Sequence, residues 1–245
     1  MPFGKRPVSN DSVPQHSPPY VNRIFEFRDV TVLTVRYRTS FASISDLVPD
    51  VLEIEDEPLV TATLLDYGTS PSKPFKEFIH TVEAKYLGKS YEFCLALILD
   101  NEIGVLNGRE PTGFPKRLGN LSFIKGASNG ASGHVERPAG QKLVEFVFEA
   151  KAKQVPVPRL DRPFLNLRVI PSPILGAPAS VKEFVPLIFE IKPEEVWEGT
   201  GKLTFPEDAP FVESVNKIEV LRYESSTLAY GSTCILGGAE RVFPL

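Results

Sequence analysis

The chain has 245 residues, of which 42% are hydrophobic and 24% are charged, and its net charge is -4. This composition is typical of a globular protein and excludes a largely disordered chain. The small negative charge gives no electrostatic reason to expect binding to nucleic acid or to an anionic membrane surface.

The N-terminal residues 1–20 are rich in proline and serine and lack the apolar core of a signal peptide. No apolar run in the chain approaches the roughly 18 to 20 residues that a membrane-spanning helix needs. We therefore expect a cytoplasmic protein without a membrane partner. We divide it into a Pro-rich arm, residues 1–20, and a single β domain, residues 21–245.

The residue types that bind metals are few and scattered. His16, His80 and His134 lack the spacing of a metal site, and the nucleotide-binding and serine-hydrolase motifs are absent. Cys94 and Cys234 lie in apolar, strand-like runs, so we expect two buried thiols rather than a disulfide. The sequence predicts no metal and no cofactor.

The first half of the chain predicts strands with one short helix. Residues 25–39 alternate between apolar and polar side chains, which is typical of a strand. Residues 40–47 fit a short helix that is capped by Thr39 or Ser40 and ends before Pro49. Further strands are predicted at 59–65, 77–86 and 91–99, and the last of these is apolar enough to be a central strand.

The second half of the chain predicts more strands separated by turns. Asn129-Gly130 favours a hairpin loop between residues 121–125 and 134–137. The remaining strand candidates are 141–150, 165–170, 187–191, 202–205 and 218–230. Many short strands and 23 prolines predict a mainly β fold, an antiparallel barrel or sandwich with few short helices.

One stretch, residues 107–119 with the sequence NGREPTGFPKRLG, carries two adjacent cations, Lys116 and Arg117. For most such pairs the simplest interpretation is a surface loop with solvated side chains. The whole pattern G-R-E-x-x-x-[FY]-P-K-[KR]-L-G, however, resembles the signature of the acetoacetate decarboxylase family. In that family the lysine after the proline forms a Schiff base with a keto acid, and the matching residue here is Lys116.

The resemblance extends from about residue 25 to about residue 242, and its weaker motifs occur in the expected order. They are Tyr37-Arg38-Thr39, Asp56-Glu57-Pro58-Leu59-Val60, Phe75-Lys76-Glu77, Trp197-Glu198-Gly199 and Asp208-Ala209-Pro210. The family has a β-barrel-like, cone-shaped fold with a few helices. This agrees with the fold predicted from the strand pattern.

The resemblance implies covalent catalysis by Lys116, which requires an uncharged amine. Two features of the motif disfavour the ammonium form: apolar neighbours such as Phe114, and the second cation at Arg117. Adjacent residues of a strand point to opposite faces, so we expect desolvation to have the larger effect.

The family pattern also assigns further residues around the lysine. It makes Glu77 the pocket carboxylate that moves protons, although a surface carboxylate beside Lys76 is the alternative. It points to Arg28 as the cation for the substrate carboxylate; an exposed arginine on a strand is equally compatible with the sequence. A second family glutamate is replaced here by Thr63, which leaves the fate of the imine open.

Three hypotheses on function follow. The first is a lyase that decarboxylates a β-keto acid through an imine on Lys116. The second uses the same lysine and pocket for aldolase-type or dehydratase-type chemistry on a keto acid, and Thr63 keeps it open. The third is a non-enzymatic barrel that binds a small carbonyl compound and lacks a buried lysine. The partner is in each case a small molecule, and the resemblance implies a homo-oligomer.

Overall fold

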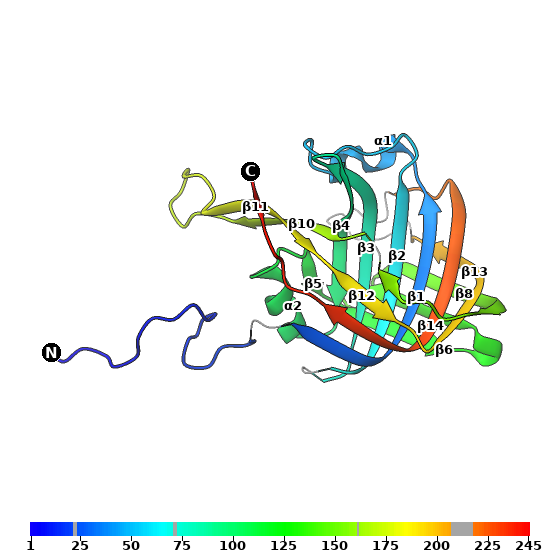
Figure 1. Ribbon diagram of the computed structural model, residues 1–245, viewed down its shortest axis with the longest axis horizontal. Helices are drawn as coiled ribbons and strands as arrows, with labels where there is room; N and C mark the ends of the chain where they lie inside the picture. Colours follow the sequence, from blue (N-terminus) through cyan, green and yellow to red (C-terminus); the bar gives the residue numbers. More distant parts are fainter. Residues whose placement is uncertain (22–23, 71–72, 161, 207–217) are drawn as a thin grey trace.

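The computed structural model describes the chain except for residues 22–23, 71–72, 161 and 207–217. Strands dominate it, and the helices are short (Figure 1). The first elements in chain order are β1 Phe25–Arg38, α1 Phe41–Ile44, β2 Leu59–Thr69, β3 Phe75–Tyr86, β4 Lys89–Leu99, α2 Glu102–Arg109, β5 Lys116–Leu118, β6 Asn120–Lys125 and β7 Ala131–Glu136. They are followed by β8 Lys142–Gln154, β9 Arg159–Leu160, β10 Phe164–Ile170, β11 Val181–Leu187, β12 Phe189–Lys192, β13 Glu195–Thr204, β14 Arg222–Leu236 and β15 Phe243–Pro244.

The strands form one large, curled sheet in the order β15-β11-β10-β4-β3-β2-β1-β14-β13-β8-β7-β6. Its described pairs are antiparallel except at β4, which pairs in parallel with β5 and β10. The central strands β1 to β4 bury both faces, so their sequences are long apolar runs rather than simple alternations.

One end of the sheet curls back over the even-numbered face of β2. The hairpins of β6, β7 and β8 bring β6 against β2 and β3. The core between them is made of large apolar side chains such as Leu33, Leu64, Phe78, Phe146 and Phe148, each exposed by 2% or less. Burial of these side chains provides the main driving force for this half of the fold.

The other end of the sheet closes around the opposite face. β10 attaches to β4, β11 returns along β10, and the chain then crosses to β12, which pairs with the end of β14. A second core lies inside this enclosure, with Val32, Leu65, Leu97 and Leu187 among its members. β1 to β4, β10, β12 and β14 therefore surround a narrow compartment, and the candidate site lies within it.

The predicted fold class is confirmed, and the differences are local. Ser40 caps the predicted short helix: its side chain accepts a hydrogen bond from the Ser43 backbone N–H, and a 3-10 turn follows at Ser45–Leu47. The strand predicted at 187–191 is divided into two. β11 ends at Leu187 and pairs with β10, whereas β12 begins at Phe189 and pairs with β14, so Ile188 lies at the change of partner. The strand predicted at 218–230 begins at Arg222, and the Asp208-Ala209-Pro210 motif lies outside the described residues.

The short helix α2, within the motif region, was not expected. Its N-cap is Asn101, whose side chain accepts a hydrogen bond from the Gly104 N–H at 2.8 Å. Asn107, Gly104 and Gly108 all have low helix propensity, so the stretch after the capping residue Asn101 gives little indication of a helix. The packing of α2 against β4 and β5 therefore stabilises the helix despite the low intrinsic helix propensity of its residues.

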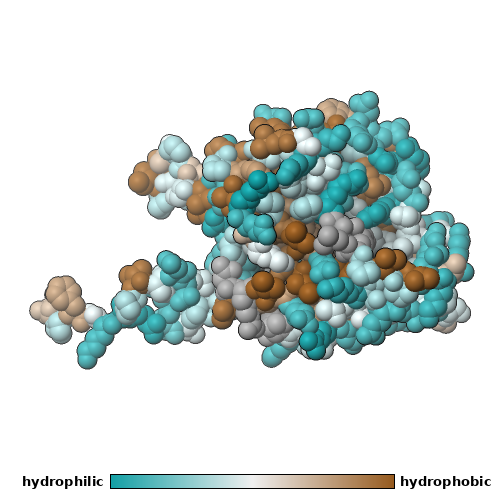
Figure 2. Space-filling view, viewed as in Figure 1, coloured by the Kyte–Doolittle hydropathy of each residue, from teal (hydrophilic) through white to brown (hydrophobic). Residues whose placement is uncertain are grey.

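The residues before Tyr20 contain no helix or strand and are mostly exposed; they extend away from the sheet (Figure 1). On the face shown in Figure 2, hydrophobic side chains gather in a hollow in the middle of the molecule, whereas most of the surrounding surface is hydrophilic. In the described part of the chain, no helix is both long enough and apolar enough to span a bilayer.

Candidate active site

The motif folds as the end of a helix, a tight turn and a short strand. The Phe114 N–H donates to the Gly108 carbonyl at 3.1 Å, which closes the turn after α2. Lys116 then begins β5, in register with Leu97 of the buried strand β4. The Arg109 guanidinium donates to the Lys116 carbonyl at 3.0 Å, so this arginine braces the loop. These contacts hold the Lys116 backbone and direct its side chain into the compartment.

Gly108 makes room for the lysine side chain. A Cβ atom at this position would lie 2.4 Å from both Cδ and Cε of Lys116 and 3.0 Å from Nζ. Since carbon atoms do not approach to 2.4 Å without a clash, any larger residue at 108 would displace the side chain. The glycine in the G-R-E part of the motif therefore has a steric role in the site.

Lys116, Glu77 and Tyr67 form a buried polar chain. Lys116 Nζ lies 2.9 Å from Glu77 Oε1, and the two side chains are exposed by 11% and 5%. The contact is an ion pair without the angles of a hydrogen bond. Glu77 Oε2 accepts a hydrogen bond of 2.8 Å from the Tyr67 hydroxyl. Burial, and secondarily the nearby Glu77, raises the pKa of Tyr67 well above its ordinary value, so this phenol remains a proton donor.

The rest of the compartment around Nζ is apolar. Phe114 places its ring centroid 5.5 Å from Nζ, and Tyr67 stacks on Phe75 at 4.2 Å between centroids. The lining side chains are Phe27, Tyr67, Phe75, Glu77, Ile79, Leu97, Phe114, Lys116, Phe164, Phe189 and Leu236. The free volume is about 30 Å³, close to that of one water molecule, so a substrate displaces side chains when it enters.

The structure brings together some of the predicted site residues. Lys116, Glu77 and Phe114 all line this cavity. Arg117 follows Lys116 in β5 and is half-buried, outside the lining set, as expected from strand alternation. Thr63 lines a neighbouring cavity, which shares Ile79, Phe164 and Phe189 with the first.

Arg28 lies away from the lysine. Its side chain is 73% exposed and forms an ion pair with Glu26 at 2.7 Å. Phe27, the residue before it, points into the cavity, so the strand turns Arg28 towards solvent. Lys116 is the one cation among the side chains that line the cavity in the described part of the chain.

Sequence reasoning missed Tyr67 and the aromatic lining other than Phe114. Tyr67 lies on the same face of β2 as Thr63, four residues on, and the register places it diagonally across from Glu77. The alternation of side-chain direction along residues 59–69 could therefore have indicated that Tyr67 shares a face with Thr63. The contributions of Phe164 and Phe189 carry no local signal, because they depend on the pairing of β10 with β4 and on the crossover from β11 to β12.

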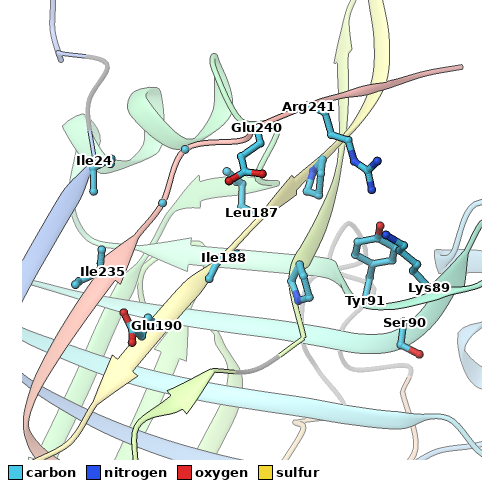
Figure 3. A pocket seen from close by; sticks show the side chains of 14 residues that line it. Ile24, Lys89, Ser90, Tyr91, Leu187, Ile188, Glu190, Ile235, Glu240 and Arg241 are labelled. Atoms are coloured by element: carbon cyan, nitrogen blue, oxygen red, sulfur yellow. The ribbon is translucent and has the colours of Figure 1, made fainter.

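A larger cavity, of about 550 Å³, lies on the other side of β12 (Figure 3). Ile188 and Glu190 face it, whereas Phe189 between them faces the Lys116 compartment. Tyr91 and Arg241 also line it. The Lys116 amine therefore lies not in the more spacious cavity but in the smaller one.

Two further groups with reactive potential are buried. Cys94 and Cys234 are free thiols, as predicted, and each is exposed by 4% or less. Burial raises the pKa of the Cys94 thiol well above its ordinary value and that of Cys234 to about 12, so both remain protonated. Among the described residues, no group of three His, Cys, Asp or Glu side chains is placed to hold a metal ion.

A family model described as acetoacetate decarboxylase matches residues 1–242. The chain belongs to the acetoacetate decarboxylase family. It is 40% identical to decarboxylase DEC1 of Cochliobolus heterostrophus over 230 residues, which cover 91% of this chain and 90% of that protein. The family match supports the assignment of this chain as an enzyme of the lyase class.

Solved structures with the same fold are also found. An acetoacetate decarboxylase structure superposes with a TM-score of 0.82 at 21% identity, covering 95% of this chain and 94% of that one. The enduracididine biosynthesis enzyme MppR, solved with the condensation product of pyruvate and imidazole 4-carboxaldehyde, has a TM-score of 0.77 at 18% identity and covers 99% of both chains. The fold is thus that of the acetoacetate decarboxylase family.

Proposed function

We propose that the protein is a Schiff-base-forming lyase that decarboxylates a β-keto acid through an imine on Lys116. The observation that carries the proposal is the 2.9 Å pair of Lys116 Nζ and Glu77 Oε1 inside an apolar cavity. A buried amine beside a carboxylate can pass its proton to that carboxylate and become the neutral nucleophile.

The reaction follows from this geometry. The neutral amine of Lys116 attacks the keto carbon and forms the new carbon–nitrogen bond. The carbonyl oxygen then takes one proton from Glu77 and one from the attacking nitrogen and leaves as water, which gives a protonated imine. The carbon–carbon bond to the carboxylate then breaks, and its electron pair moves into the protonated imine to give an enamine and carbon dioxide. Protonation of the enamine at carbon and hydrolysis of the imine release the ketone and restore the lysine.

The lining favours loss of the carboxylate. No second cation lines the described cavity, so a substrate carboxylate enters an apolar environment next to Phe114, Phe75 and Phe27. Desolvation disfavours the charged carboxylate, and departure of neutral carbon dioxide relieves that penalty. In this proposal Arg28, at the surface, attracts the anionic substrate rather than holding it during the reaction.

Trapping the imine tests the proposal. The protein is incubated with β-keto acids, reduced with borohydride, and digested for mass spectrometry. The expected result is a covalent adduct on the peptide that contains Lys116, with carbon dioxide released in the unreduced reaction. Lys116→Arg removes the adduct, whereas Lys202→Arg, at an exposed position of β13, serves as the matched control and retains it. Failure to trap an adduct with any keto acid would reject the proposal.

A second candidate function uses the same imine for condensation or dehydration of a keto acid. The observations that favour it are Thr63 in place of the family's second glutamate and the fold shared with MppR. Adding an aldehyde together with the keto acid separates the two. A new carbon–carbon bonded product without carbon dioxide release supports condensation. The non-enzymatic hypothesis expected a cavity without a buried lysine, and Lys116 is 9% exposed.

A further inference from the structure

A second, polar cavity adjoins the Lys116 compartment. Its walls include Ile79, Phe164 and Phe189, which also line the compartment, so the two spaces share one partition. The ring centroids of Phe164 and Phe189 lie 6.2 Å apart, and both side chains are half-buried. A substrate that displaces these rings on entering therefore opens a path from the lysine to the second cavity.

The far walls of this cavity are hydroxyl and carboxyl groups. Thr61 and Thr63 come from β2, Thr81 from β3 and Glu92 from β4. Thr61, Thr81 and Glu92 are exposed by 6% or less, and the Thr81 hydroxyl donates to Glu92 Oε2. Strand alternation places the three threonines on the same sheet face as Tyr67 and Glu77.

The Thr61 hydroxyl is the feature that the fold does not explain. Its oxygen is buried, and it has no hydrogen-bond partner within the protein. A buried polar group without a partner costs roughly 1 to 3 kcal/mol. The free space beside it is about 30 Å³, enough for one small group that both donates and accepts hydrogen bonds.

The charges in the cavity select the kind of group. Arg162, the cation in its wall, forms an ion pair with Glu83. The carboxyl oxygens of the buried Glu92 accept hydrogen bonds, so this wall favours a group that can donate one. A hydroxyl group meets both requirements, since it donates to a carboxyl oxygen and accepts from Thr61.

We infer that this polar cavity is a substrate subsite for a hydroxyl group carried on the part of the keto acid remote from its carboxylate. The inference rests on the proposed function, because it assumes that the keto carbon is held at Lys116. From Glu77 to Thr81 the strand advances by about 13 Å, at 3.3 Å per residue. The hydroxyl therefore belongs on a chain that extends past the keto group, not on a substrate as short as acetoacetate.

A matched substrate series tests the subsite. Straight-chain β-keto acids of increasing length are compared with analogues that carry a terminal hydroxyl, and with analogues that carry a terminal carboxylate, by kcat/KM for carbon dioxide release. We expect the hydroxyl analogue to be preferred by about 10-fold to 100-fold at one chain length, because a site built for a hydroxyl rejects the analogue without it. Equal values at every length, or a preference for the second carboxylate, would overturn the inference.

Variants of Thr61 test whether the preference for hydroxyl-bearing substrates arises in this cavity. Thr61→Val keeps the shape, and it should bring the ratio between hydroxyl and plain substrates close to one. Thr61→Ser restores a hydroxyl and should restore the ratio. Thr31→Val is the control, since Thr31 is equally buried in β1 and does not line the cavity. A ratio unchanged in Thr61→Val rejects the subsite.

Borohydride trapping distinguishes failure of the subsite from failure of the proposed function. Borohydride adducts on Lys116 that form equally with plain and hydroxyl substrates leave the proposed function intact and reject the subsite alone. Absence of any adduct rejects the proposed function itself. Glu92→Gln, which retains the size of the side chain, provides a second variant and should reduce the preference in the same direction as Thr61→Val.

Discussion

The ion pair of Lys116 and Glu77 is the residue-scale feature on which the proposed chemistry depends. Each partner is nearly enclosed, so each charge relies on the other for compensation. Removing one member of such a pair leaves a buried charge alone, whereas removing both does not. Stability measurements on single and double variants therefore report whether the pair is ionised.

Lys116→Met should destabilise the protein by about 3 to 5 kcal/mol if Glu77 is left as an unpaired, buried carboxylate. The double variant Lys116→Met/Glu77→Gln should recover most of this loss, because no charge remains in the cavity. Urea unfolding followed by fluorescence measures both. A double variant as unstable as the single one would show that packing of the lysine stem, and not its charge, causes the loss.

Glu77→Gln should lower kcat by about 100-fold to 10,000-fold, the usual contribution of a group that transfers protons. Glutamine has the same size and cannot take the proton of Lys116, so imine formation becomes slow. Rates of adduct formation in single-turnover trapping measure the effect. A variant with a normal trapping rate but slow product release would place Glu77 in hydrolysis of the imine instead.

Tyr67→Phe should lower kcat by about 10-fold and leave the fold intact. The ring keeps its stacking on Phe75, and only the hydroxyl that donates to Glu77 Oε2 is lost. The matched control is Tyr37→Phe, which removes a buried hydroxyl in the other core, where it contacts His80 at 2.9 Å. Equal activity in Tyr67→Phe and wild type would show that Glu77 needs no fixed orientation.

The sequence could predict that Lys116 and Glu77 belong to one site, and the structure brings them together, but it could not predict their surroundings. Lys116 and Glu77 lie in short motifs, so their types and spacing are visible along the chain. Arg28 shows the limit: it was assigned to the substrate, yet its neighbour Phe27 occupies the cavity. A shift of one residue moves a side chain to the other face of a strand. Local bulges, such as the one between Phe27 and Val30, make it impossible to tell from the apolar pattern which face a residue occupies.

At the scale of elements, α2 sets the position of the lysine through Gly108. Gly108→Ala should raise intrinsic helix propensity by about 1 kcal/mol but displace Lys116, whose Cδ and Cε occupy the space of the new methyl group. We expect imine trapping to slow at least 10-fold. Ile103→Ala, at an exposed position of the same helix, is the control and should trap normally. Unimpaired trapping in Gly108→Ala would show that the helix moves aside.

Most strands could be predicted because two-sided burial produces unmistakable apolar runs, as in residues 91–99. The helix α2 and the split between β11 and β12 could not. Both arise from tertiary packing: Gly108 is buried against Lys116, and the Ile188 carbonyl accepts a hydrogen bond from the Gly237 N–H at 3.0 Å. Neither contact can be recognised from the residues that neighbour it in the sequence.

At the scale of the whole molecule, His80 makes stability depend on pH. It is fully buried beside Tyr37 and the rings of Phe78 and Phe205, and burial lowers its pKa from 6.5 to about 3. The unfolded chain therefore binds more protons than the folded one between these values. This contribution to stability is complete above pH 6.5 and is lost as the pH falls, by about 1.4 kcal/mol per pH unit.

His80→Gln should flatten this acid response while retaining a hydrogen-bonding group beside the Tyr37 hydroxyl. Free energies of unfolding at pH 5.0, 5.75 and 6.5 test the prediction in a range where most carboxyl groups stay ionised (on the order of pKa 4). The difference between wild type and variant should shrink towards acid. A difference that stays constant over this range would mean that His80 is accessible to protons in the folded state.

The compartment around Lys116 links the site to the order in which the chain is synthesised and folds. Its lining runs from Phe27 to Leu236, so the first strand and the last long strand must both be in place before the lysine is shielded from water. Contacts this distant in sequence form late and slowly during folding. Chains that end before β14 would carry the complete motif but hold its amine in solvent. Under the proposed mechanism, Lys116 therefore becomes an effective nucleophile only when synthesis of the chain is almost finished.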